Sequence, residues 1–201
     1  MPSPTHIHPV FDRLLQRSDK EALLGQRGLV VWMTGLSGSG KSTIAGELER
    51  LLHASQVYSI VLDGDNVRTG INSNLGFSEA DRTENIRRIA EVARLFVQNG
   101  AVVICCFVSP TIALREQARA IIGADDFIEV FIDTPLAECE RRDVKGLYAK
   151  ARAGEVKDFT GISAPFETPT APAIRIATQG RSEGETANEL LNFILPRVTR
   201  T

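Results

Sequence analysis

Five runs of apolar, often β-branched residues recur along the chain. They lie at 29–33, 58–62, 101–108, 127–132 and 173–177, and the last is the weakest. A strand with one face in water alternates apolar and polar residues, whereas an uninterrupted apolar run is typical of a strand buried on both faces. The pattern therefore predicts a parallel sheet that is covered on both faces.

Helical patterns lie between these runs. Apolar residues at helical spacing from 86 to 97 make one helix face, which Ser78 begins as a capping residue and Gly100 closes. A second helix is predicted from 134 to 142 and a final amphipathic one around 187–194. Strands that alternate with helices predict an α/β fold, a three-layer sandwich with helices on both faces of the sheet.

A glycine-rich segment follows the first predicted strand. Residues 35–43 are Gly-Leu-Ser-Gly-Ser-Gly-Lys-Ser-Thr, which fits the phosphate-binding pattern G-x-x-x-x-G-K-[ST] between a strand and a helix. The glycines let successive N–H groups turn toward phosphate oxygens, and the next helix adds its positive end. Lys41 would reach the β- and γ-phosphates, and Ser42 would offer its hydroxyl to Mg²⁺. The chain is therefore predicted to bind a nucleoside triphosphate in a P-loop NTPase fold.

Composition narrows the setting. The chain has 201 residues and a net charge of −2, which suits one α/β domain and gives no strong attraction to nucleic acid or to an anionic membrane. No apolar run is long enough to span a bilayer, and the first residues lack the features of a signal peptide. The adjacent Cys105 and Cys106 lie in an apolar strand and cannot make a disulfide framework, so we expect a cytoplasmic protein.

Polar residues follow the second and third predicted strands, where ligands of parallel sheets bind. Asp63 directly ends the second run, so it is a candidate for holding Mg²⁺ or accepting a proton from an attacking hydroxyl. Asp65 and Arg68 lie farther out, toward an acceptor substrate. Ser109 follows the third run and is presented by Pro110. Because no histidine is nearby in sequence, its chemistry favours a substrate contact over a covalent phosphoserine.

Two further segments carry positive charge. Arg82 and Asn85 are one helical turn apart at a helix N-terminus, a face that suits an anion, and Phe77 is near enough to stack on a base. A solvated, charged turn explains that spacing equally well. The basic segment of about 141–161 contains glycines and is predicted to form a mobile lid over the phosphates, the alternative being a solvated basic helix.

From about Leu24 onward, these segments together resemble the adenylyl-sulfate kinase family. The segments that carry the resemblance are 35–43, 62–68, 75–78, 84–88, 108–110, 145–148, 150–154 and 159–162. It implies transfer of the ATP γ-phosphoryl group to the 3′-hydroxyl of adenosine 5′-phosphosulfate, giving 3′-phosphoadenosine 5′-phosphosulfate and ADP. It also implies an N-terminal extension at 1–24, one kinase domain at 25–201, a homodimer, and possible association with ATP sulfurylase.

The resemblance also implies roles for individual residues. Lys41, Asp63 and Ser109 would be catalytic, with Ser42 and Asp63 at Mg²⁺, and the family's label of phosphoserine intermediate falls on Ser109. Phe77 and Phe159 would sandwich the acceptor adenine. ATP would contact Gly35, Leu36, Ser37, Gly38, Ser39, Gly40, Lys41, Ser42, Thr43 and, at its base, Arg141. The acceptor would contact Asp65, Arg68, Phe77, Arg82, Asn85, Val108, Ser109, Lys145 and Phe159.

Two other functions share the phosphate-binding loop. A P-loop kinase for another small hydroxyl metabolite would keep the loop but would not need the acceptor-side residues Asp65, Arg68, Phe77 and Asn85. A non-catalytic nucleotide switch is the third hypothesis, and the intact Lys41 and Asp63 argue against it. On the sequence, direct in-line transfer is favoured over a covalent intermediate, because it requires only positioning and charge neutralisation.

Overall fold

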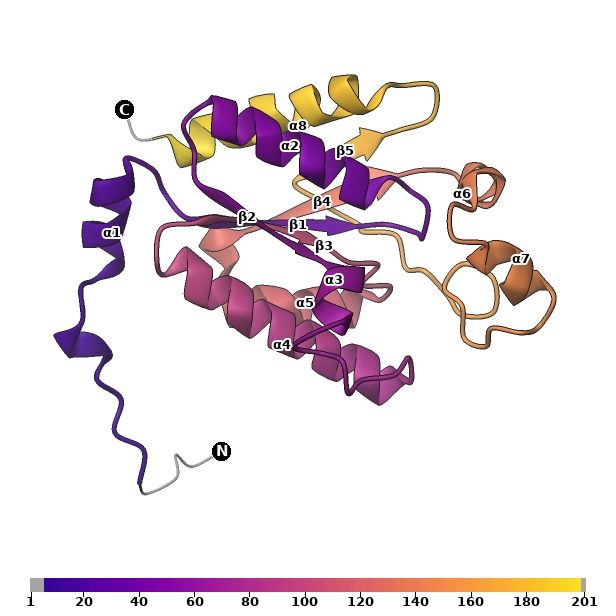
Figure 1. Ribbon diagram of the computed structural model, residues 1–201, viewed down its shortest axis with the longest axis horizontal. Coiled ribbons are helices and arrows are strands. Elements are labelled where there is room, and N and C mark those ends of the chain that lie inside the picture. The colour runs from indigo at the N-terminus through magenta and orange to yellow at the C-terminus, as the bar shows by residue number, and fades with distance from the viewer. Residues whose placement is uncertain (1–5, 200–201) are drawn as a thin grey trace.

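All five predicted strands form one sheet in the computed structural model, which describes residues 6–199 (Figure 1). The strand order is β2-β3-β1-β4-β5, and every pairing is parallel. The predicted fold class is therefore confirmed. The strands are β1 (Leu29–Thr34), β2 (Ser59–Asp63), β3 (Val102–Cys106), β4 (Phe127–Asp133) and β5 (Ile174–Ala177).

Helices cover both faces of the sheet (Figure 1). One face packs against α2 (Lys41–Ala54) and α8 (Glu183–Val198), and the other against α4 (Glu79–Val97) and α5 (Ile112–Ile122). Successive residues of β1 point to opposite layers, as the pleat requires. Val31 therefore enters one core and Trp32 the other. Both cores are apolar, which explains why the strands have no alternating pattern.

The helix α5 was not predicted from the sequence. Its N-cap is Thr111, whose side chain accepts a hydrogen bond from the Leu114 backbone N–H. Leu114, Ala118 and Ile122 are buried on one face, at the spacing of an amphipathic helix. The signal was therefore present, but two arginines and a glutamate interrupt the apolar pattern, and one of those arginines, Arg115, is itself buried.

Three short helices lie at the carboxyl ends of the strands. They are α3 (Gly64–Arg68), α6 (Leu136–Arg142) and α7 (Leu147–Arg152). Figure 1 shows α6 and α7 projecting beyond the end of the sheet. The predicted lid, residues 141–161, comprises the last turn of α6, the whole of α7 and the loop that follows it.

The opposite edge of the sheet holds α1 (Arg17–Leu24), which is preceded by the short 3₁₀ helix η1 (Phe11–Arg13). The guanidinium of Arg17 pairs with Asp126 of the 3₁₀ helix η2 (Ala124–Asp126) and donates to the Gly28 carbonyl at 2.7 Å. Part of the predicted 1–24 extension is thus bonded to the domain. Within residues 6–199, no helix combines the length and apolarity that crossing a membrane requires.

Candidate active site

A cavity of about 600 Å³ opens at the carboxyl edge of the sheet. Most of the predicted site residues line it, although they come from segments as far apart in sequence as Ser37 and Phe159. The predicted residues in its lining are Ser37, Gly38, Ser39, Gly40, Lys41, Ser42, Thr43, Asp63, Asp65, Arg68, Phe77, Arg82, Asn85, Val108, Ser109, Lys145 and Phe159.

The backbone of the phosphate-binding loop depends on glycine at specific positions. Gly35 has a φ of 155° and Gly40 a φ of 102°, both outside the range that other residues favour. A Cβ at Gly35 would lie 2.7 Å from the Ile132 carbonyl oxygen of β4, so no side chain fits there. Gly40 is the N-cap of α2, and the loop consequently delivers backbone N–H groups at the start of a 14-residue helix.

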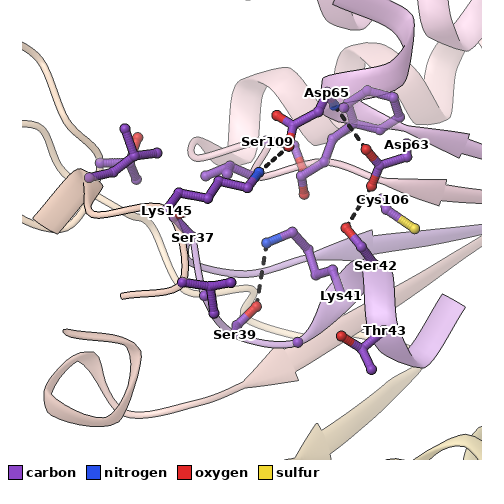
Figure 2. A pocket seen from close by; sticks show the side chains of 18 of the residues that line it. Ser37, Ser39, Lys41, Ser42, Thr43, Asp63, Asp65, Cys106, Ser109 and Lys145 are labelled. Atoms are coloured by element: carbon purple, nitrogen blue, oxygen red, sulfur yellow. Dashed lines mark hydrogen bonds and ion pairs between the residues drawn. The ribbon is translucent and has the colours of Figure 1, made fainter. Parts of the chain in front are cut away.

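Lys41 is buried beneath this loop. Its Nζ donates to the carbonyls of Gly35 at 2.9 Å and Leu36 at 2.7 Å, and lies 3.4 Å from Ser39 Oγ (Figure 2). Burial lowers its pKa from 10.5 to about 8, because removal from water disfavours the ammonium form. An anion in the loop would favour that form. The site therefore holds a cation whose charge is poorly compensated until a phosphate group arrives.

A chain of polar contacts runs from the loop to the lid (Figure 2). Ser42 Oγ donates to Asp63 Oδ2 at 2.6 Å, and Asp63 Oδ1 accepts from the Asp65 N–H at 2.9 Å. The Asp65 carboxylate in turn pairs with Lys145, which follows α6. Ser42 and Asp63 thus bring a hydroxyl and a carboxylate oxygen together at the cavity, the hard oxygen donors that Mg²⁺ prefers. These two residues fit a magnesium site.

An aromatic and cationic surface lines the other side of the cavity. The Arg68 guanidinium carbon lies 4.4 Å from the centre of the Phe77 ring, which is 64% exposed. Arg82 donates to the Asp158 carbonyl at 2.7 Å, next to Phe159. An exposed ring beside two guanidinium groups suits a ligand that has both a planar base and an anionic group.

Asn85 is buried at the base of this surface. Its Oδ1 accepts a 2.9 Å hydrogen bond from Asn72 Nδ2, which fixes the orientation of the Asn85 amide. The side-chain oxygen of Asn72 is buried without a partner among the described residues. Asn85 therefore presents its own NH₂ group in a fixed direction.

Ser109 is buried in the wall of the cavity, and its hydroxyl is engaged by the protein. Its Oγ accepts from the Trp32 indole N–H at 3.2 Å and lies 3.1 Å from Thr34 Oγ1. Neither partner is a base. The residue has a backbone φ of 36°, which is unusual for a residue other than glycine. These contacts fit a residue held in a rigid turn better than they fit an activated nucleophile.

Three predicted nucleotide contacts lie outside the cavity lining. Gly35 and Leu36 instead direct their carbonyls at Lys41. Arg141, predicted at the ATP base, is absent from this lining, and its side chain is 73% exposed and pairs with Glu138. The neighbouring Arg142 lines the cavity. Helical periodicity could have distinguished the two, because Arg142 is three residues after the buried Cys139 and shares its face.

Sequence reasoning also missed polar residues that follow β5 and one aromatic residue of α7. Thr178 lines the cavity and its hydroxyl bonds to that of Thr134 at 2.6 Å. Tyr148 is buried and donates from its hydroxyl to the Ser37 carbonyl at 2.8 Å. Thr178 was open to prediction, because it follows a strand as Asp63 does. Nothing in the pattern around Tyr148 indicated a bond to the phosphate-binding loop.

Comparison with known proteins identifies the family of the chain. Residues 27–177 match the family model described as adenylylsulphate kinase. The adenylyl-sulfate kinase of Bacteroides fragilis is 61% identical, over 100% of this chain and 99% of that protein. Mycobacterium tuberculosis APS kinase CysC, solved in complex with AMPPNP and APS, is 50% identical with a TM-score of 0.81, covering 84% of this chain and 98% of that one.

A longer relative has a different organisation. The bifunctional enzyme NodQ of Rhizobium tropici is 50% identical over 92% of this chain, yet the match covers 29% of its length. The family model spans most of the chain, and the Bacteroides fragilis relative matches it from end to end. The chain belongs to the adenylyl-sulfate kinase family.

Proposed function

We propose that this protein transfers the γ-phosphoryl group of ATP to the 3′-hydroxyl of adenosine 5′-phosphosulfate. The products are 3′-phosphoadenosine 5′-phosphosulfate and ADP. The observation that carries the proposal is one cavity with two dissimilar halves. The phosphate-binding loop forms one half, and the exposed Phe77 ring with Arg68 and Arg82 forms the other. The relative solved with AMPPNP and APS supports the same pair of ligands.

The nucleotide half is assigned to ATP. The N–H groups at the start of α2 and the Lys41 ammonium bind the phosphates, and Arg142 with Thr178 lines the end of the cavity assigned to the base. Ser42 and Asp63 would hold Mg²⁺, which neutralises charge on the phosphate oxygens when it is bound. Lys41 stabilises the charge that develops in the transition state.

The acceptor half is assigned to adenosine 5′-phosphosulfate. Phe77 and Phe159 stack on its adenine, and Arg68 and Arg82 bind its anionic groups. Asp63 lies between the halves, and we assign to it the proton of the attacking hydroxyl. Ser109 orients the acceptor rather than carrying the phosphoryl group, because its hydroxyl is held by Trp32 and Thr34 and has no adjacent base.

A coupled assay tests this function. ADP release is followed with ATP, Mg²⁺ and adenosine 5′-phosphosulfate, and parallel reactions contain gluconate or shikimate as acceptor. Of the three acceptors, we expect only adenosine 5′-phosphosulfate to be turned over, and its product to be phosphorylated at the 3′ position. Turnover with another hydroxyl compound at a comparable rate would favour the second kinase hypothesis. Nucleotide binding without turnover of any acceptor would favour a switch.

We also propose that residues 141–161 close over the bound phosphates and that the protein is a homodimer. The Lys145–Asp65 ion pair supports the first proposal, because it connects the lid to α3, the short helix that follows β2. Protection of this segment from proteolysis on adding both ligands would test closure.

Light scattering after gel filtration would give the mass of the assembly and so test the proposed homodimer. The family resemblance makes ATP sulfurylase a partner to test by co-purification.

A further inference from the structure

Arg115 of α5 is a buried arginine behind the wall of the acceptor half of the cavity. Its side chain is 2% exposed, and it is not among the residues that line the cavity. Its Nε pairs with Glu129 Oε1 of β4 at 2.7 Å. Its two terminal nitrogens donate to the carbonyls of Ser109 and Glu167, each at 2.8 Å. One planar group therefore bonds three separate parts of the structure.

One of those parts is the segment 159–167, which we call the strap. At its start, Phe159 enters the cavity. At its end, the Glu167 N–H donates to the Pro110 carbonyl at 2.8 Å, and its carboxylate accepts from the Ile112 N–H at 2.6 Å. The end of the strap is thus attached to the turn that contains Ser109. Arg115 completes the attachment through the Glu167 carbonyl.

The Ser109 turn is the second part. A non-glycine residue at a φ of 36° costs free energy and persists where its surroundings hold it. The Ser109 side chain is held by Trp32, and the Ser109 carbonyl is held by Arg115. The guanidinium is rigid and planar, so it fixes the distance between the two carbonyls that it binds. A lysine ammonium has no such fork.

We propose that Arg115 is a positioning residue for the acceptor, which rests on the proposed function. By bonding the Ser109 turn and the strap to Glu129 of the central sheet, it sets the separation between Ser109 and Phe159. These two residues lie on the acceptor half of the cavity. The phosphate-binding loop is supported by other groups, including Thr134, whose hydroxyl donates to the Ser39 carbonyl at 2.9 Å. Loss of the fork should therefore affect acceptor binding and spare ATP.

The test compares Arg115→Lys with Arg119→Lys. Both arginines lie on α5, and both approach Glu129, Arg119 at 3.7 Å. The described contacts of Arg119 are with Glu116, Glu129 and the Phe127 ring, away from the turn and the strap. Each substitution preserves the charge, so Glu129 is not left without a cation.

For each variant, kcat and the KM values of ATP and adenosine 5′-phosphosulfate are measured. Arg115→Lys should raise the acceptor KM about tenfold and change the ATP KM less than about twofold. Arg119→Lys should change neither. Trp32 gives a second readout, because it is the single tryptophan and its indole N–H bonds to Ser109 Oγ. Its emission spectrum should shift in Arg115→Lys. Arg119→Lys serves as the control for the KM values only, because Arg119 lies over the Phe127 ring, which packs against Trp32.

An unchanged acceptor KM in folded Arg115→Lys, or equal rises in both KM values, would overturn the proposal. If this variant does not fold, Arg115→Met/Glu129→Met replaces the ion pair with apolar groups and must give the same selective change. Failure of both variants to fold would make Arg115 a folding residue and end the proposal. Absence of wild-type turnover with this acceptor would refute the proposed function instead, and the Trp32 emission would still report whether Arg115 sets the turn.

Discussion

The two edges of the sheet use the same kinds of polar side chain for different purposes. At the amino edge, the Gln26 amide donates to the carbonyls of Tyr58 and Gly100 and accepts from the Tyr58 N–H. Arg17 there bonds to Asp126, Glu21 and Gly28. These groups satisfy one another within the protein. They hold α1 and the loops between elements in place.

At the carboxyl edge, charged groups are brought together with room left beside them. Lys41 is held by carbonyls rather than by a carboxylate, and the pairs Ser42–Asp63 and Asp65–Lys145 border the cavity. Of these groups Lys41 is buried, and its burial costs free energy that a bound phosphate would recover. We infer that the amino edge determines stability and the carboxyl edge determines function, and variants at each edge can separate the two.

The largest effect should come from Lys41→Met. Removing the charge that stabilises the transition state should raise the activation free energy that corresponds to kcat/KM by about 3 kcal/mol or more. The fold should be at least as stable at neutral pH, because burial disfavours the ammonium. Steady-state kinetics and thermal unfolding measure both quantities, with Lys20→Met at the amino edge as the control. Near-normal activity in folded Lys41→Met would contradict the assigned role.

The same lysine predicts a pH dependence. Its pKa is lowered to about 8 in the folded protein from 10.5, so the unfolded chain binds more protons between these values. Stability of the protein without ligands should therefore rise with pH across that window, relative to Lys41→Met. Urea unfolding at several pH values measures the difference. A difference that falls with rising pH would show that the folded protein favours the charged form.

The second effect concerns the proton acceptor. Asp63→Asn should lower kcat at least about 100-fold, because an amide cannot accept the proton of the attacking hydroxyl and is a weaker ligand for Mg²⁺ than a carboxylate. Ser109→Ala should lose less than about tenfold, since in direct transfer the Ser109 hydroxyl forms no bond to phosphorus. Stereochemistry at a chiral γ-phosphorus separates the mechanisms. Net retention, or an inactive but folded Ser109→Ala, would mean a covalent phosphoserine.

Much of the fold was predictable, because β1 and the loop after it carry local signals. The apolar strands, the glycines required at φ values such as that of Gly35, and Asp63 at a strand tip all follow from short-range rules. The bond between Tyr148 and the loop was not predictable, because it joins residues 111 positions apart. Arg115 lay outside prediction for a related reason: a basic residue on a helix usually faces water, and two of its partners, Glu129 and Glu167, belong to other segments of the chain.

The third effect tests the amino edge. Asp126→Asn should lower the free energy of unfolding by about 2 kcal/mol, since Arg17 and Arg27 lose their shared carboxylate. KM and kcat should not change. Asp125→Asn is the matched control, because Asp125 is the adjacent residue and is exposed. If Asp126→Asn is fully folded under the assay conditions and is still less active, the two edges are coupled.

The ion pair at Asp126 has a pH signature of the same sign as that of Lys41, because the pKa is lowered in both, but it falls in the acidic range. Burial opposes ionisation of this carboxyl group, but hydrogen bonds from Arg17 and Arg27 outweigh it and lower its pKa. The stabilisation is therefore present above the unfolded pKa and is lost as the pH falls through the folded one. Unfolding measured from pH 6 downward should show the wild type converging on Asp126→Asn. Parallel curves would mean that the carboxylate contributes little.

The smallest effect separates the two halves of the carboxyl edge. Arg68 lies on the Phe77 ring and donates to the Leu75 and Gly76 carbonyls, so Arg68→Ala removes both a cation and the support of the ring. The acceptor KM should rise about tenfold while the affinity for a non-hydrolysable ATP analogue is unchanged. Arg87→Ala on α4, outside the cavity lining, is the control. Equal losses for both ligands would place Arg68 in the nucleotide half, and the division of the cavity would have to be redrawn.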